Sequence, residues 1–139
     1  MQTSKLSMFE ILKIILYGHQ PAAKITNKKL EWLIQREFGV QALVLKEKLE
    51  RLKGETQQAK NRNAAAILML SNTDIDAIDQ LIGVSNRDFR DVVARAEYPG
   101  CFELGFVDFP TGLVRRRQLY MADWEQYIKW IRMPSTSRP

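Results

Sequence analysis

The sequence predicts an α+β fold that is predominantly α-helical: a helical N-terminal portion, then a helix-turn-helix, a β-hairpin and a C-terminal helix. Over most of the 139 residues, apolar side chains recur at spacings of three and four, the period of a helix with one buried face. Near residues 102–107 the period changes to two, as in a strand. With 45% hydrophobic and 27% charged residues, the chain has the composition of an ordinary globular protein.

The first part of the chain predicts two helices before Gly39. Residues 4–17 carry apolar side chains on one face, and Glu10 and Lys13 interrupt the apolar stretch 6–17, so we expect an amphipathic helix rather than a signal or membrane segment. A second helix is expected to begin after Thr26 or Asn27, either of which can cap it, and to end at Gly39. Its buried face is expected to hold Leu30, Leu33, Ile34 and Phe38.

Residues 41–53 predict a third helix. Its apolar stripe consists of Ala42, Leu45, Leu49 and Leu52. Two pairs of opposite charge stand four residues apart on the other face: Lys46 with Glu50, and Glu47 with Arg51. This spacing predicts ion pairs along a solvated helix face.

The polar segment 54–63 predicts a hinge. It separates a basic helical portion, residues 1–53, from a winged-helix-like portion, residues 64–132, which opens with a short buried helix at 64–70. Two prolines and two serines without apolar periodicity predict a flexible tail at 133–139.

Residues 73–97 predict two helices joined by a very short turn. Thr73 is the expected N-cap of the first helix, with Asp74 and Asp76 in its first turn. Gly83 supplies a left-handed residue at its end, and Ser85 caps the second helix. The inner face of the second helix is expected to hold Phe89, Val92, Val93 and Ala96.

The remainder of the chain predicts a β-hairpin and a last helix. The first strand spans 101–108, a turn containing proline and glycine spans 109–112, and the second strand returns over 113–120. The last helix, 123–132, is expected to bury Trp124, Tyr127, Ile128 and Ile131.

One recognisable pattern runs through these elements. It consists of Ile78 and Ile82, Gly83-Val84-Ser85, Phe89 and Val92, Tyr98-Pro99, Arg115-Arg116-Arg117, Ala122-Asp123-Trp124 and Gln126-Tyr127-Ile128. In this order, residues 73–132 resemble the small winged helix-turn-helix domains of the phage excisionase and MerR type. The resemblance covers about 60 of the 139 residues.

The resemblance implies a non-enzymatic DNA-binding regulator whose second helix enters the major groove of double-stranded DNA. The groove-reading residues would then be Asn86, Arg87 and Arg90. The phosphate contacts would come from Arg115, Arg116 and Arg117.

The charge distribution leaves a second function open. The net charge is +5, but residues 1–72 hold 12 Lys/Arg against 6 Asp/Glu, whereas residues 73–139 hold 9 against 10. Neutralisation of phosphates by Lys and Arg supplies much of the affinity for DNA. An excess of acidic residues in the part of the chain that would contact DNA is therefore unfavourable. Asp79 also occupies a position where such domains place a small residue.

The alternative is a protein-interaction module of the antitoxin, immunity or adaptor type, whose basic half binds an acidic protein partner or forms a homodimer. Trp32 and Trp130 lie off the apolar stripes of their helices and are the expected partner-binding residues.

The sequence gives little support for a catalytic or metal-binding site. His19 is the only histidine and Cys101 the only cysteine, which excludes an internal disulfide and a His-rich metal site. There is no glycine-rich phosphate loop, and Glu103 and Asp108 stand five residues apart on opposite faces of the expected strand. We therefore expect no enzyme activity, no cofactor, no metal and no membrane attachment, and a cytoplasmic location.

Overall fold

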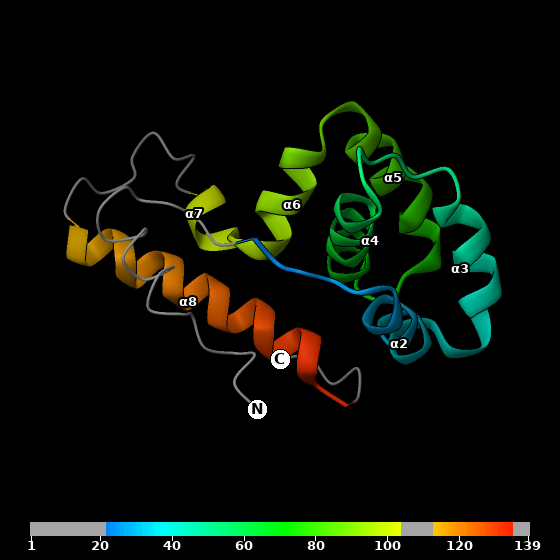
Figure 1. The fold of residues 1–139 in the computed structure, drawn as a ribbon, viewed down its shortest axis with the longest axis horizontal. Helices are drawn as coiled ribbons and strands as arrows, with labels where there is room; N and C mark the ends of the chain where they lie inside the picture. The colour runs from blue at the N-terminus through cyan, green and yellow to red at the C-terminus, as the bar shows by residue number, and fades with distance from the viewer. Residues whose placement is uncertain (1–21, 104–112, 135–139) are drawn as a thin grey trace. The chain divides into compact units, whose positions relative to one another are not determined.

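The structure, a computed structural model, describes residues 22–103 and 113–134. Every regular element within these two stretches is a helix, and none is a strand (Figure 1). Contacts between the elements define two compact units, one formed by Ala23–Ala96 and one that includes Glu97–Arg132. Three predictions lie outside the described residues: the helix at 4–17, the turn at 109–112 and most of the tail.

The first helix of the Ala23–Ala96 unit is α2 (Asn27–Phe38), and it begins and ends as predicted. The hydroxyl oxygen of Thr26 accepts a hydrogen bond from the backbone N–H of Lys29 at 3.0 Å, which satisfies one of the unpaired donors of the first turn. The helix ends at Gly39, whose φ of +49° lies in the region that favours glycine. Its inner face buries Leu33, Ile34 and Phe38.

The predicted third helix is shorter than expected. A turn of 3₁₀-helix, η1 (Gly39–Gln41), leads into α3 (Ala42–Leu49). The predicted stripe is confirmed, because Ala42, Leu45, Leu49 and Leu52 are all buried.

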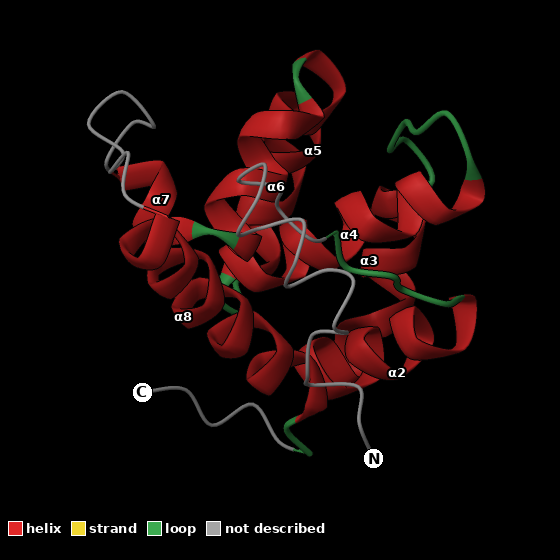
Figure 2. Ribbon diagram, turned by 60° about the vertical axis from the view of Figure 1, so that its left-hand side comes forward, coloured by secondary structure: helices red, strands yellow, loops and turns green. Residues whose placement is uncertain are grey.

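The centre of this unit is α4 (Gln57–Ser71), which contacts both α2 and α5 (Figure 2). Thr56 caps it by accepting from the N–H of Ala59 at 3.0 Å. The helix includes residues 57–63, which had been expected in the hinge, and continues through the predicted segment 64–70. Residues 64–68 are each at most 2% exposed. The polar residues at its start concealed the helix, because Asn61 and Asn63 are buried in it although their side chains are polar.

A buried amide fixes α4 against the start of α2. The Asn61 side chain donates to the backbone oxygen of Ile25 at 3.1 Å and to the side-chain oxygen of Asn27 at 2.7 Å. It accepts from the Gln57 amide at 2.9 Å. Asn61 is only 3% exposed, so these bonds replace the water it loses on folding.

The connection after α4 differs from the prediction at Thr73. Asn72 and Thr73 both have positive φ, +52° and +63°, so Thr73 lies in a turn and does not cap a helix. Asp74 takes that role, and its carboxylate accepts from the N–H of Asp76 at 3.0 Å at the start of η2 (Ile75–Ala77).

The predicted turn between the next two helices is also wrong. α5 (Ile78–Arg87) continues through Gly83 and Ser85, and its buried face keeps helical spacing throughout. The break comes at Asp88, whose carboxylate accepts from the N–H of Arg90 at 3.2 Å. α6 (Phe89–Glu97) then begins. Glycine is tolerated inside a helix at a cost of about 1 kcal/mol, which tertiary packing offsets here.

The α+β prediction fails in the Glu97–Arg132 unit. α7 (Pro99–Glu103) contains the first residues of the expected first strand, and α8 (Leu113–Arg132) contains the whole expected second strand. The sequence from 113 to 132 has no glycine or proline, and Tyr120, Trp124 and Tyr127 are buried at helical spacing. The helix predicted over 123–132 is therefore confirmed and extends ten residues further toward the N-terminus.

Aromatic rings and one carboxylate hold this unit together. The Tyr98 ring meets the Tyr120 ring edge-on at 5.8 Å between centroids and stacks on Trp124 at 6.3 Å. The Asp123 carboxylate accepts from the backbone N–H groups of Gly100 and Cys101 at 3.1 and 2.9 Å, so α8 caps the start of α7. A Cβ on Gly100 would lie 2.9 Å from Asp123 Oδ1, which explains the glycine at this position.

Candidate functional site

Three of the exposed large apolar residues that the structure describes lie on one face of η1 and α3. Val40, Leu43 and Val44 are 101%, 75% and 46% exposed. They occupy positions n, n+3 and n+4 of a continuous helical segment, so their side chains share one face. We call these three residues the α3 apolar face. The buried residues of α3 occupy the opposite side of the helix.

Sequence reasoning missed this face. Residues 42–45 read Ala-Leu-Val-Leu, four apolar residues in succession, and such a run contains residues on every side of a helix. The run itself was the available signal, because a helix with a single buried face does not need Leu43 or Val44.

Trp32, predicted to bind a partner, lies on α2 and is 38% exposed. The ammonium group of Lys29 lies 4.1 Å from the centre of the indole ring, and the guanidinium carbon of Arg36 lies 5.2 Å from it. Both separations fall within the range of cation–π attraction. The two cations hold the ring in one orientation, and Arg36 is itself paired with the buried carboxylate of Glu37 at 2.9 Å.

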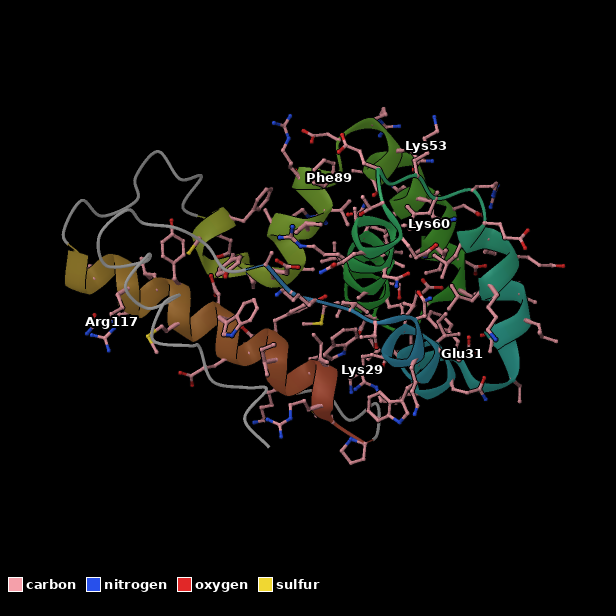
Figure 3. All side chains as sticks on the ribbon, in the orientation of Figure 1. Lys29, Glu31, Lys53, Lys60, Phe89 and Arg117 are labelled. Atoms are coloured by element: carbon pink, nitrogen blue, oxygen red, sulfur yellow. The ribbon has the colours of Figure 1, made fainter. Side chains whose placement is uncertain are left out.

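A groove opens between α2, α3 and α4. Its cavity volume is about 220 Å³. The apolar part of its lining is formed by Leu30, Ile34, Leu49, Leu52 and Ala64. The polar part includes Glu31, Lys46, Glu50, Gln57 and Lys60, of which Glu31 and Lys60 are labelled in Figure 3.

Ion pairs join the helices around this surface, and they differ from the two predicted along α3. Lys46 pairs with Glu31 of α2, which brings the two walls of the groove together. Lys48, at 2.8 Å, and Arg51 both pair with Asp79 of α5. The Lys48 hydrogen bond, aided by Arg51, lowers the pKa of Asp79. Asp79 is half exposed, so no carboxylate is buried at the position where the sequence pattern placed one.

Asn86, predicted as a groove reader, has a structural role in this fold. Its side-chain oxygen accepts from the backbone N–H of Lys53 at 2.9 Å, and its side-chain nitrogen donates to the backbone oxygen of Arg51 at 3.0 Å. The amide therefore fixes the end of the α3 segment to α5. Both of its hydrogen-bonding ends are engaged, which leaves it poorly placed to contact a base edge.

The other predicted nucleic-acid contacts are not brought together on a wing. Arg87 and Arg90 are exposed at the junction of α5 and α6, where Arg90 pairs with Asp88 at 3.1 Å. Arg115, Arg116 and Arg117 lie in the first turn and a half of α8 rather than in a strand, and Arg115 and Arg117 are exposed. Successive residues of a helix point about 100° apart, so Arg115 and Arg117, two positions apart, lie on different sides of α8.

Trp130 occupies a buried position, 3% exposed, with its ring stacked on Tyr127 at 5.7 Å. Cys101 is also buried, and burial together with its contact to Asp123 raises the pKa of the thiol to about 12. A thiol in such surroundings is a poor nucleophile.

Two general findings apply to the described residues. Within them, no three side chains of His, Cys, Asp or Glu gather as they do around a metal ion. None of the helices described is both long and apolar enough to cross a membrane.

No protein-family model, curated protein or solved structure matches the chain.

Proposed function

We propose that this protein is a protein-interaction module, and that it binds a partner through the α3 apolar face together with Trp32. The observation that carries the proposal is the exposure of Val40, Leu43 and Val44 on one side of a helix whose opposite side is fully packed. Exposed aliphatic residues that share a face are a common mark of a protein-binding surface. Their burial against a partner would remove apolar area from water.

The chemistry of the partner follows from the charges on the same unit. Lys24, Lys28 and Lys29 surround the start of α2, and the first turn of that helix contains no acid. The positive end of the helix dipole adds to these charges. A partner with an apolar segment bordered by acidic residues would complement this surface, and the acids would mainly accelerate association.

DNA binding through the helix-turn-helix receives less support from the geometry. The side chain of Asn86 is engaged with the backbone, and the expected second strand of the wing is a helix. Arg90 is paired with an acid at the start of α6. These features count against the predicted DNA-contacting residues. They therefore favour the protein-interaction function over DNA binding.

The test places a photo-crosslinking amino acid at position 43 in the full chain, with position 80 as the matched control. Both positions are exposed, but Gln80 lies on α5, away from the α3 apolar face. We expect crosslinks to one protein, rich in acidic residues, from position 43 and none from position 80. Leu43→Asp should abolish copurification of that protein, whereas Gln80→Asp should not.

The same preparation is titrated with random-sequence duplex DNA at several salt concentrations, in wild type and in Arg115→Glu/Arg117→Glu. The proposal predicts no tight, steeply salt-dependent binding. Equal crosslinking from both positions, together with DNA affinity that falls steeply with salt and is lost in the double variant, would replace the proposed function with DNA binding.

A further inference from the structure

The groove between α2, α3 and α4 is a second unfilled surface, separate from the α3 apolar face. Its apolar floor lies at the centre of the three helices, and its cavity measures about 220 Å³. A cavity of roughly 150 Å³ is large enough to hold a benzene ring. The groove therefore has room for one aromatic side chain.

Two charged residues that line the groove have no ion partner among the described residues. Lys46 and Glu31 neutralise each other across the two walls. Lys60 and Glu50 also line the groove, and no ion pair joins either of them to another described residue. An occupant that presents an acid and a base beside an apolar group would satisfy both.

The chain itself carries such a group on α6. Phe89 is 47% exposed, although sequence periodicity placed it on the buried face of its helix. Its neighbours in the chain, Asp88 and Arg90, have side chains 50% and 80% exposed. They pair with each other at 3.1 Å, and an exposed pair of this kind is weak enough to rearrange. Figure 3 labels Phe89 on α6 and Lys60 on α4, and Phe89 is not among the residues that line the groove of its own copy.

We propose that the protein self-associates by inserting Phe89 of one copy into the groove of a second copy. Arg90 then lies beside Glu50 of the second copy, and Asp88 lies beside Lys60. The ring buries its apolar surface on the floor of the groove, and the two charge pairs fix its direction of entry. This inference is independent of the proposed function, because the contact uses neither the α3 apolar face nor Trp32.

The contact joins two different surfaces, so it is head-to-tail. Each copy in a pair retains one empty groove or one free Phe89, unless the geometry closes a ring. The average mass in solution should therefore rise with protein concentration. An interface formed by one aromatic ring and two charge pairs is small. We therefore expect the association to be weak and reversible.

Sedimentation velocity of the full chain over a wide concentration range tests the proposal. We expect the wild type to increase in average mass, and Phe89→Ser to lose at least about tenfold in association constant. Gln80→Ser, at an exposed position on α5, is the matched control and should behave as wild type. Far-UV circular dichroism establishes that each variant is folded. Leu43→Asp should also self-associate normally, which separates this contact from the proposed function.

Charge reversal supplies a test that does not depend on removing the ring. Glu50→Lys and Arg90→Glu should each weaken association alone, because each places like charges at the contact. A mixture of the two variants should regain it, because the groove of the first accepts the α6 end of the second. A wild type that remains monomeric at every concentration, a Phe89→Ser variant that associates normally, or a mixture no stronger than its components would each overturn the proposal.

Discussion

The two compact units are stabilised by different kinds of contact. In the Ala23–Ala96 unit, the core is aliphatic, with Leu33, Leu45 and Ile67 fully buried, and amides and ion pairs connect one helix to the next. In the described part of the Glu97–Arg132 unit, aromatic rings pack against one another, and the Asp123 carboxylate caps the start of α7. Among the described residues, the first unit leaves an apolar helix face and a groove exposed to solvent, and the proposed contacts rest on these two surfaces.

This difference indicates which residues can be replaced without loss of the fold. The residues chosen for replacement in the proposed contacts are exposed, so changing them should affect association and little else: Leu43, Glu50, Phe89 and Arg90. In the Glu97–Arg132 unit, the described contacts serve the packing of α7 against α8. Replacements there should affect stability first.

The largest expected effect concerns the reactivity of Cys101. Its thiol pKa is raised from 9.0 to about 12, so at pH 8 the thiolate fraction falls about a thousandfold. Alkylation by iodoacetamide should be slower in the native protein by at least this factor than in urea. If Cys101 were alkylated in the native protein nearly as fast as in the unfolded chain, the Glu97–Arg132 unit would open readily. The proposed difference in packing between the two units would then be wrong.

The second effect comes from the aliphatic core. Ile67→Ala, in the middle of α4, should reduce the free energy of unfolding by about 2–5 kcal/mol, because the residue is 0% exposed. Val84→Ala, at a partly exposed site on α5, is the control and should cost less. Urea unfolding measured by far-UV circular dichroism gives both values. If Cys101 remains protected while helix content is lost in Ile67→Ala, the two units unfold separately.

The third effect comes from the carboxylate that caps α7. Asp123→Ala leaves two backbone N–H donors without an acceptor and should cost about 1–3 kcal/mol. Gly100→Ala should disturb the same contact, because its Cβ would lie 2.9 Å from the carboxylate oxygen. The two changes should therefore be non-additive in a double-mutant cycle monitored by thermal unfolding. Full additivity would mean that the carboxylate acts elsewhere.

The sequence was most informative where local chemistry decides the structure. Thr26 and Gly39 mark the ends of α2 because a hydroxyl cap and a left-handed residue need no distant partner. The apolar stripe of α3 was equally predictable, since it follows from helical spacing alone. In these segments the local signals and the tertiary contacts agree.

The errors arose where distant packing overrides a local signal. Gly83 and Ser85 resemble a helix break, but the apolar face of α5 continues past them, and the helix follows its packing. Residues 113–120 were predicted as a strand because a period-two segment and a turn with proline and glycine precede them, and helical spacing was counted only from residue 123 onward. Tyr120, one turn before Trp124, continues the buried helical spacing and argues against a strand there.

The candidate surfaces required the structure for a related reason. A leucine or valine shows its exposure only when the neighbouring elements are in place, so the α3 apolar face could not be separated from the core residues beside it. Phe89 was assigned to the core by periodicity, yet it stands at the first residue of α6, where no neighbouring helix covers it fully. The groove depends on three helices and has no signature in any one of them.

The smallest expected effect tests the ion pairs that distinguish the Ala23–Ala96 unit. The Asp79 pKa lies below its usual value because Lys48 and Arg51 stabilise the charged form. A carboxylate with a lowered folded-state pKa stabilises the protein above its unfolded-state pKa, and this contribution disappears as pH falls through the folded-state value. We therefore expect thermal stability to decline below about pH 4 in wild type, and Asp79→Asn to show a shallower decline.

The magnitude should be small, because all three side chains are partly exposed and water screens their attraction. Molar salt should shrink the difference between wild type and Asp79→Asn at neutral pH. Asp76→Asn, at an exposed acid on η2, is the matched control and should leave the pH profile close to wild type. Identical profiles for wild type and Asp79→Asn would show that packing, rather than charge, joins α3 to α5, and the two units would then differ only in the chemistry of their cores.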